Sequence, residues 1–153
     1  MQAHELAAPY PTVRMDTSAL DAARLIIDLG RPGLIVVDEH EHPIAILPNS
    51  QVLRVMIPGY VQDDPALARV LDEAYADHIS DVLSQRTVAD MLPRDRVTLP
   101  VVAPDDTALE IAAIMAANRS PIVAVVEERS KTAPMLGAIT VSMLLGRLLP
   151  PAS

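Results

Sequence analysis

The four histidines of this chain are scattered, and cysteine is absent. The densest group is His40-Glu41-His42, where metal-type ligands alternate in a short polar stretch. This pattern fits either a metal site or a solvent-exposed turn, and its place between two apolar runs favours the turn. His78, with Asp77 and Asp81, falls on the polar side of a predicted helix and is expected to face solvent.

The remaining candidates have structural explanations beside chemical ones. Asp16 and Asp105 each stand just before a helix-start signal, so a turn or cap role is favoured over paired acid chemistry. Arg86, Arg94 and Arg96 either offer charge to a phosphate or are surface residues. Cysteines are absent, as are a Ser/His/Asp constellation, a glycine-rich phosphate loop and an HExxH helix. The sequence therefore predicts no enzyme and no metal site.

Composition narrows the functional classes further. The chain has 153 residues, enough for one domain or for two half-domains that share a core. Half of its residues are hydrophobic, but Phe and Trp are absent, so Leu, Ile, Val, Ala and Met must fill the core. A net charge of −8 disfavours nucleic acid and anionic lipid as partners. With no long apolar segment and no secretion signal, we expect a cytoplasmic protein without membrane insertion.

The chain contains an internal repeat, and a repeat of this length determines which folds are possible. Pro11–Glu39 aligns without a gap on Pro100–Glu128, and Ala45–Met56 aligns on Gly137–Leu148 after a slightly larger shift. A longer polar turn in the second copy accounts for the difference between the two shifts. Two copies imply two equivalent faces, with a cleft between them as a natural ligand site.

Each copy is predicted to fold as β-α-β-β-α. Hydroxyl and acid residues spaced as capping boxes open the first helix of each copy, at Ser18 and Asp21 and at Thr107 and Glu110. Buried β-branched runs predict the central strands. The predicted strands are Pro11–Met15, Gly33–Asp38 and Pro43–Leu47 in the first copy, and Val97–Ala103, Ile122–Glu127 and Met135–Thr140 in the second. In the first copy, one predicted helix ends near Leu29 and the other spans Ser50–Ile57. In the second copy, the predicted helices span Ala108–Asn118 and Ser142–Leu149.

The segment between the copies is predicted to be helical. Asp63, Asp64 and Pro65 form a helix start, and Ala66–Leu83 has apolar residues at helical spacing. A short helix follows at Thr87–Leu92, and His4–Ala8 is its expected counterpart before the first copy. The predicted divisions are 1–58 for the first repeat, 59–86 for the linking segment and 87–153 for the second repeat.

The order of these motifs, occurring twice, resembles the cystathionine-β-synthase (CBS) domain family, as a tandem pair or Bateman module. The resemblance rests on 88–92, 105–115, 120–127 and 137–145 in the second copy, and on 16–26, 33–39 and 45–53 in the first. It implies an α/β (α+β) fold with two β-α-β-β-α repeats packed with pseudo-twofold symmetry, plus a linking helix. It also implies a regulatory, non-enzymatic module that commonly forms a homodimer.

In that family the clefts bind adenosine compounds such as AMP, ADP, ATP or S-adenosylmethionine. The implied signature is Gly, two apolar residues, Ser or Thr, two residues, and Asp, with the hydroxyl on phosphate and the Asp on ribose. The second copy has Gly137, Thr140 and Met143 at these positions; the first has Ala45, Pro48 and Gln51. Neither copy has the ribose carboxylate, and the second alone keeps the hydroxyl.

The resemblance implies two clefts, of which the one that contains Thr140 is favoured. The favoured cleft is lined by Thr12, Val13, Pro32, Gly33, Leu34, Thr140 and Met143. The second cleft is lined by Val101, Val102, Pro121, Ile122 and Gln51. Two functions remain open: a sensor of an adenosine-type ligand that acts on a separate partner, such as a transporter or enzyme, or a ligand-free scaffold for dimerisation or partner binding. The apolar helix ends near Met56 and over 143–149 are either core or dimer interface.

Overall fold

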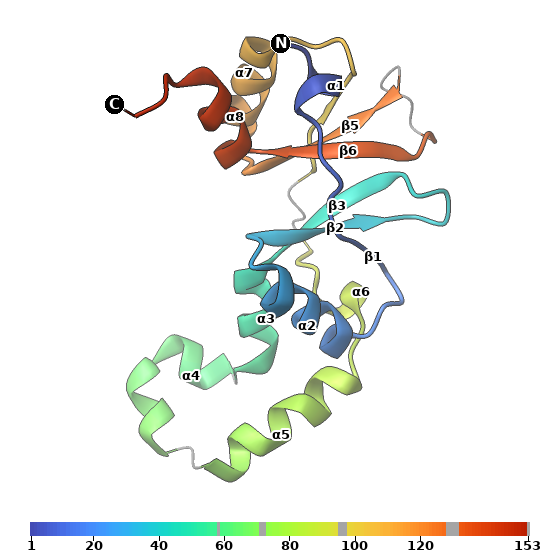
Figure 1. The fold of residues 1–153 in the computed structure, drawn as a ribbon. Helices are drawn as coiled ribbons and strands as arrows, with labels where there is room; N and C mark the ends of the chain where they lie inside the picture. The colour runs from blue at the N-terminus through green and yellow to red at the C-terminus, as the bar shows by residue number, and fades with distance from the viewer. Residues whose placement is uncertain (58, 71–72, 95–97, 128–131, 153) are drawn as a thin grey trace. The chain divides into compact units, whose positions relative to one another are not determined.

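The computed structural model describes residues 1–57, 59–70, 73–94, 98–127 and 132–152 (Figure 1). The first repeat comprises β1 (Thr12–Arg14), α2 (Ala19–Leu29), β2 (Gly33–Val37), β3 (Pro43–Pro48) and α3 (Asn49–Met56). The second comprises β4 (Val101–Val102), α7 (Ala108–Asn118), β5 (Ile122–Val126), β6 (Met135–Thr140) and α8 (Val141–Leu148). Two three-stranded sheets have the orders β1-β2-β3 and β4-β5-β6. The predicted fold class and the β-α-β-β-α order of each repeat are confirmed.

The central strand of each sheet is buried along its whole length, as its β-branched sequence requires. All five residues of β2 and all five of β5 are buried. β5 pairs in parallel with β4 and antiparallel with β6, so it lies in the middle of its sheet. The predicted strand Val97–Ala103 is reduced to β4; its first residue lies outside the described part of the chain.

Hydroxyl caps set the starts of the two equivalent helices α2 and α7. The Ser18 hydroxyl accepts a hydrogen bond from Asp21 N at 3.0 Å, and the Thr107 hydroxyl accepts one from Glu110 N at 3.3 Å. Both helices end at a residue in the left-handed conformation, Gly30 and Arg119. These local signals explain why the two helices begin and end at equivalent positions.

The linking segment differs from the single helix predicted over Ala66–Leu83. It contains α4 (Gly59–Asp63), a 3-10 helix η1 (Pro65–Val70) and α5 (Glu73–Ser84). Residues 66–69 are all exposed, so tertiary packing does not extend the helix there. α5 packs against α2 and α3 and buries Leu83 to 3% exposure. Among the described residues, no helix is long and apolar enough to cross a membrane.

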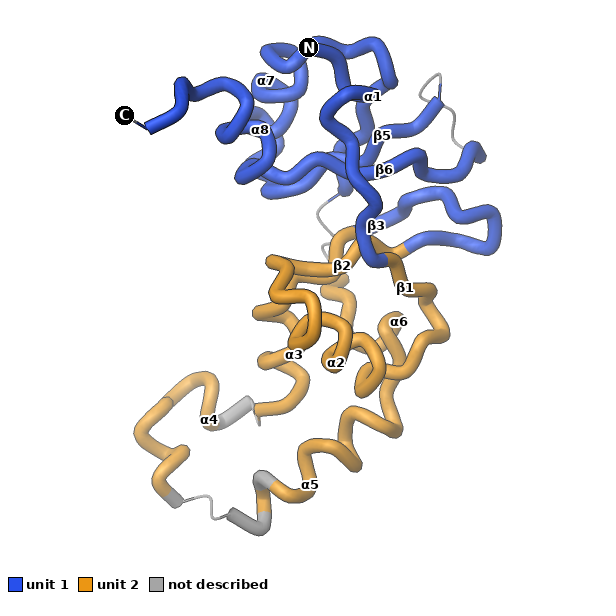
Figure 2. Tube along the Cα trace, in the orientation of Figure 1, with its two compact units in different colours: residues 1–11, 37–45, 97–153 blue, residues 12–36, 46–96 orange. Residues whose placement is uncertain are grey.

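The chain divides into two compact units that do not follow the repeat boundaries (Figure 2). Unit 1 comprises residues 1–11, 37–45 and 97–153, and unit 2 comprises residues 12–36 and 46–96. The leading helix α1 (Ala3–Leu6) precedes the first repeat but lies in the unit that holds most of the second. The short helix α6 (Val88–Met91) precedes the second repeat but lies with the first.

Equivalent hydrogen bonds hold the two leading helices in place. In unit 1, Ala3 N donates to Asp106 O at 2.8 Å, and Ala108 N donates to Met1 O at 3.1 Å. In unit 2, Val88 N donates to Thr17 O at 2.9 Å, and Ala19 N donates to Arg86 O at 2.9 Å. In the alignment of the two copies, the acceptor Thr17 corresponds to Asp106 and the donor Ala19 corresponds to Ala108. Each repeat is therefore completed by the leading helix that the chain places before the other repeat.

Gly33 is expected to be intolerant of a side chain, whereas Gly146 is expected to gain from one. A Cβ at Gly33 would lie 2.6 Å from the Leu47 carbonyl oxygen, inside the sheet. Gly33→Ala should lower the free energy of unfolding by about 1–3 kcal/mol through overpacking. The matched change Gly146→Ala, in α8 with nothing within 4 Å of the added Cβ, should raise it by about 0.5–1 kcal/mol. Chemical denaturation of both variants checks this pair, and equal effects would contradict it.

Candidate functional site

The first half-site lies in unit 2, where β1, the start of β2 and the start of α3 come together. Asn49 N donates to the Pro32 carbonyl at 3.1 Å, which ties the first turn of α3 to the strand entry. Val13 and Leu34 are buried at 4% and 0% exposure, and Thr12 is half-buried. This half-site is mainly apolar side chains and backbone, and Thr12 supplies its hydroxyl.

The second half-site lies in unit 1 and repeats this arrangement. Val141 N donates to the Pro121 carbonyl at 3.0 Å, the same bond at the equivalent position. Thr140 pairs with Ile122 in the β5–β6 ladder and is 7% exposed. Its Oγ1 accepts from Met143 N at 3.2 Å and caps α8. A hydroxyl has one donor and two acceptor positions, so this cap uses an acceptor and leaves the O–H for another group.

Each predicted cleft draws residues from both units. In unit 2 the structure gathers Thr12, Val13, Pro32, Gly33, Leu34 and Gln51. In unit 1 it gathers Val101, Val102, Pro121, Ile122, Thr140 and Met143. The residues of each half-site lie together within one unit. The two clefts, each of which would join a half-site of one unit to residues of the other, stay predictions.

The two positions that carry the ribose carboxylate in the family are used differently here. The Gln51 side-chain amide donates to the Met91 carbonyl at 2.8 Å, so it ties α3 to the C-terminal end of α6. Met143 is half-buried and has no oxygen to offer a ribose. The Gln51 contact had no sequence signal, because Met91 reaches it only through the exchanged packing of α6.

The two helix starts are also unequal. α8 begins at the capping hydroxyl of Thr140, whereas α3 begins at Pro48 without a side-chain cap. The amide groups at a helix start favour anions, and a hydroxyl there adds a donor. Thr140 therefore makes the start of α8 the better equipped of the two for a phosphate.

Gly137 has a packing role that the sequence did not indicate. A Cβ at this position would lie 3.1 Å from both Ala7 Cβ and Ala8 O. Ala8 and Ala138 exchange backbone hydrogen bonds of 3.1 and 3.0 Å, so the N-terminal segment extends along β6. The glycine is thus explained by close approach of the chain's own backbone, and Thr140, at the end of β6, is the remaining ligand-type residue of the signature.

The histidine hairpin turn is partly packed against the chain and is not wholly solvent-exposed. His42 is half-buried, and its Nδ1 lies 2.7 Å from the Ala133 carbonyl. Met135 N donates to Glu41 O at 3.0 Å, which joins the turn to the entry of β6. Within the described part of the chain, no group of three His, Asp or Glu residues is placed to hold a metal ion.

Asp38 organises this turn and is a residue that sequence reasoning missed. Its Oδ1 accepts hydrogen bonds from His40 N at 2.8 Å and His42 N at 3.0 Å. Burial raises the pKa of the Asp38 carboxyl, but these two backbone donors, with the neighbouring imidazoles, outweigh it and hold the pKa below its usual value. The signal available in the sequence was an Asp that directly follows a buried strand.

The other sequence candidates are mostly surface residues. Asp16 and Asp105 are exposed, while the neighbouring Asp106 is buried and its Oδ2 accepts from Ala103 N at 2.9 Å. His78 is exposed, as expected for the polar side of α5, and its Nδ1 lies 3.8 Å from Asp81 Oδ2. The side chains of Arg86 and Arg94 are exposed, and Arg96 lies outside the described residues.

Comparisons with known proteins agree with this architecture. A family model described as "CBS domain" matches residues 4–58, the first repeat. A crystal structure of a CBS domain-containing protein of unknown function from Kribbella flavida shares 47% sequence identity and covers 98% of this chain and 99% of that one, with a TM-score of 0.88. The chain therefore belongs to the CBS-domain family, and its two repeats form a tandem CBS pair, the Bateman module. No curated protein matches the sequence.

Two more distant structures share the fold. The CBS domain of a CBS domain-containing membrane protein from Sphaerobacter thermophilus has 24% identity and a TM-score of 0.72, with coverage of 97% of this chain and 88% of that one. CBSX2, solved in complex with AMP, has 15% identity and a TM-score of 0.65, with coverage of 95% and 94%. At these identities the likeness concerns the fold alone.

The Asp38 carboxylate should stabilise the hairpin turn in a pH-dependent way. Asp38→Asn keeps an oxygen acceptor but removes the charge, so Tm should fall slightly at pH 7. Because the folded-state pKa is lowered, the stabilisation is fully present above the unfolded value of about 3.9 and is lost as pH falls through the folded value. The Tm difference between wild type and variant should therefore shrink below pH 4. Thermal melts from pH 3 to 8, with exposed Glu39→Gln as control, measure this; a constant difference would refute it.

Proposed function

We propose that this CBS pair is a regulatory, non-enzymatic protein of the cytoplasm that senses an adenosine-type ligand and acts on a separate partner, such as a transporter or an enzyme. The ligand would be AMP, ADP, ATP or S-adenosylmethionine. The observation that carries the proposal is Thr140, whose hydroxyl stands at the start of α8 and whose O–H is not used by the helix cap. The relative crystallised with AMP supports the choice of ligand class.

The missing carboxylate sets the expected affinity. A charge-assisted hydrogen bond contributes about 1.5–3 kcal/mol, so a ribose held without one binds roughly ten- to a hundred-fold more weakly. Neither Met143 nor the Gln51 amide, which is engaged with Met91, replaces a bidentate carboxylate. The proposed sensor therefore responds to a ligand at high, millimolar-range concentration. It acts by binding one conformation or assembly better than another.

A homodimer is the proposed assembly, because exposed apolar side chains remain on the helices of both units. Leu53 is 58% exposed on α3, and Leu145 is 48% exposed on α8. Contiguous exposed apolar side chains are typical of association surfaces, and Leu53 shares one apolar face with Ile27, which is 77% exposed. A ligand that alters the contacts between two copies would change the surface offered to the partner protein.

A ligand-free scaffold is the second candidate function. One specific observation favours it: the Gln51 side chain, at a family ligand position, is used for internal packing of α6. In this alternative the module serves dimerisation or partner binding, and the half-sites have only structural roles. Introducing the missing carboxylate by Met143→Asp would then create adenosine binding that the wild type lacks.

Thermal shift measurements with each of the four ligands test the sensor. A ligand present at about ten times its Kd raises the free energy of unfolding by roughly 1.4 kcal/mol, a Tm increase of about 3–6 °C for a chain of this size. Thr140→Ala should abolish this ligand-induced shift. Thr107→Ala is the matched control, since it removes an equivalent helix cap, about 1 kcal/mol, away from the proposed cleft. It should lower the basal Tm and keep the ligand-induced shift.

The outcomes separate the two candidates. Absence of a shift with every ligand at millimolar concentration would refute the sensor and favour the scaffold. A shift that survives Thr140→Ala unchanged would show that the ligand binds elsewhere.

A further inference from the structure

A buried hydroxyl donor at the start of α8 has no partner within the described part of the chain. Ser120 and Thr140 are the buried serine and threonine among these residues, at 3% and 7% exposure. The Ser120 O–H donates to the Ile122 carbonyl at 2.6 Å. The Thr140 Oγ1 instead accepts from Met143 N, and this cap leaves its O–H unused.

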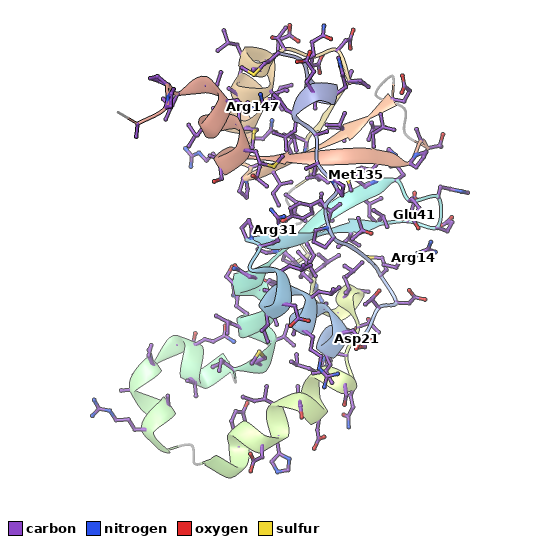
Figure 3. The ribbon with its side chains drawn as sticks, in the orientation of Figure 1. Arg14, Asp21, Arg31, Glu41, Met135 and Arg147 are labelled. Carbon is purple, nitrogen blue, oxygen red and sulfur yellow. The ribbon has the colours of Figure 1, made fainter. Side chains whose placement is uncertain are left out.

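An unused buried donor requires an acceptor from outside the chain. Buried polar groups are nearly always hydrogen-bonded, to protein or to ordered water. α8 spans eight residues from Val141, and the amide groups at its start favour an anion as that acceptor. Figure 3 labels Met135 at the beginning of β6 and Arg147 near the end of α8, and Thr140 lies between them where strand and helix meet. A phosphate oxygen fits both requirements.

Met143 lies one helical turn from this hydroxyl. Its backbone N–H is the donor that Thr140 Oγ1 accepts from, so the two residues bracket the first turn of α8. Side chains three residues apart on a helix have Cβ atoms about 5–6 Å apart. The phosphate and the sugar hydroxyls of one nucleotide are separated by a similar distance. A nucleotide phosphate on Thr140 therefore has its sugar within reach of the Met143 side chain.

The Met143 side chain offers the sugar an apolar contact. It is half-buried, so it displaces part of the water that would otherwise hydrate a sugar hydroxyl. Its thioether sulfur is only a weak hydrogen-bond acceptor. A hydroxyl that is buried without a partner weakens binding roughly five- to a hundred-fold. A sugar with fewer hydroxyls avoids this loss.

The equivalent half-site in unit 2 has the opposite chemistry. Gln51 corresponds to Met143; its Nε2 donates to the Met91 carbonyl at 2.8 Å, and its side-chain oxygen takes no part in that bond. Pro48 corresponds to Thr140 and provides no hydroxyl. The hydroxyl donor and the amide acceptor thus stand on different helices, α8 and α3. A nucleotide that is held at α8 by its phosphate meets Met143 where an acceptor for its sugar would be needed.

We propose that the half-site of Thr140 and Met143 selects an adenine 2′-deoxyribonucleotide over the corresponding ribonucleotide. The Thr140 O–H donates to the phosphate, and Met143 packs against the part of the sugar that lacks a hydroxyl. This inference rests on the proposed function and names the class of adenosine-type ligand that the same half-site takes. Met143 is its specificity-determining residue.

Thermal-shift titrations with AMP, 2′-deoxy-AMP and 2′,3′-dideoxy-AMP, up to millimolar concentrations, give an apparent Kd for each nucleotide. Met143→Leu keeps an apolar side chain, whereas Met143→Asp supplies an acceptor for the sugar hydroxyls. The aspartate should be tolerated, because an acid is favourable in the first turn of a helix and Arg147 follows four residues later. Repulsion between the new carboxylate and the phosphate is common to all three nucleotides, so the ratio of Kd values is compared.

Wild type and Met143→Leu are expected to bind 2′-deoxy-AMP at least about fivefold more tightly than AMP, with the dideoxy form no weaker than the deoxy form. Met143→Asp should reverse this order and favour AMP. The order in wild type and Met143→Leu decides the proposal even where the aspartate variant does not fold.

Two results would overturn the inference and leave the sensor intact. One is a wild type that binds AMP as tightly as 2′-deoxy-AMP, or more tightly. The other is a folded Met143→Asp variant that keeps the wild-type order, since Met143 would then not discriminate between the sugars. Absence of a shift with all three nucleotides would refute the proposed function itself, and this inference with it.

Discussion

The exchange of leading helices is the constraint on which the rest of this structure depends. Ala3 and Met91 are fully buried, yet each lies in the compact unit that holds mainly the other repeat. Their helices are short, four residues each, and are held by backbone bonds to the chain just before α7 and α2. Helices of this length are not stable alone in water, so they form only on that surface. Neither repeat therefore completes its core from its own contiguous sequence.

The exchange of leading helices also gives packing roles to two residues near the candidate site. Gly137 lies under the N-terminal segment, and Gln51 is engaged with the carbonyl at the end of α6. Both are positions of the family's ligand signature, and in this chain both serve the exchanged packing. Thr140 differs from them, because its helix cap uses only one acceptor position of the hydroxyl and leaves the O–H as a donor.

The duplication is closely matched in the scaffold and divergent on the surface. The bond from Asn49 to Pro32 recurs as the bond from Val141 to Pro121, at almost the same distance. Buried strands and helix caps tolerate little change, because packing and backbone hydrogen bonds limit them. Outer helix faces are freer to diverge. The linking helix α5 adds a third wall to the apolar face of α2 and α3, and the equivalent face of α7 and α8 has no such wall among the described residues.

The sequence by itself determined the local elements, because their causes are local. Hydroxyl caps at Ser18 and Thr107, the buried runs of β2 and β5, and the repeat alignment were enough for the β-α-β-β-α order, and the resemblance of these motifs to the CBS family indicated the CBS pair. Sequence reasoning failed at residues 66–70, where helical spacing predicted part of one continuous helix and the structure has the 3-10 helix η1 instead. Only the tertiary structure decided which repeat each leading helix completes, why position 137 is a glycine and where the Gln51 amide donates. These contacts join residues that are far apart in the chain. Contacts of that kind produce no periodic or regularly spaced pattern in the sequence, so sequence reasoning could not detect them.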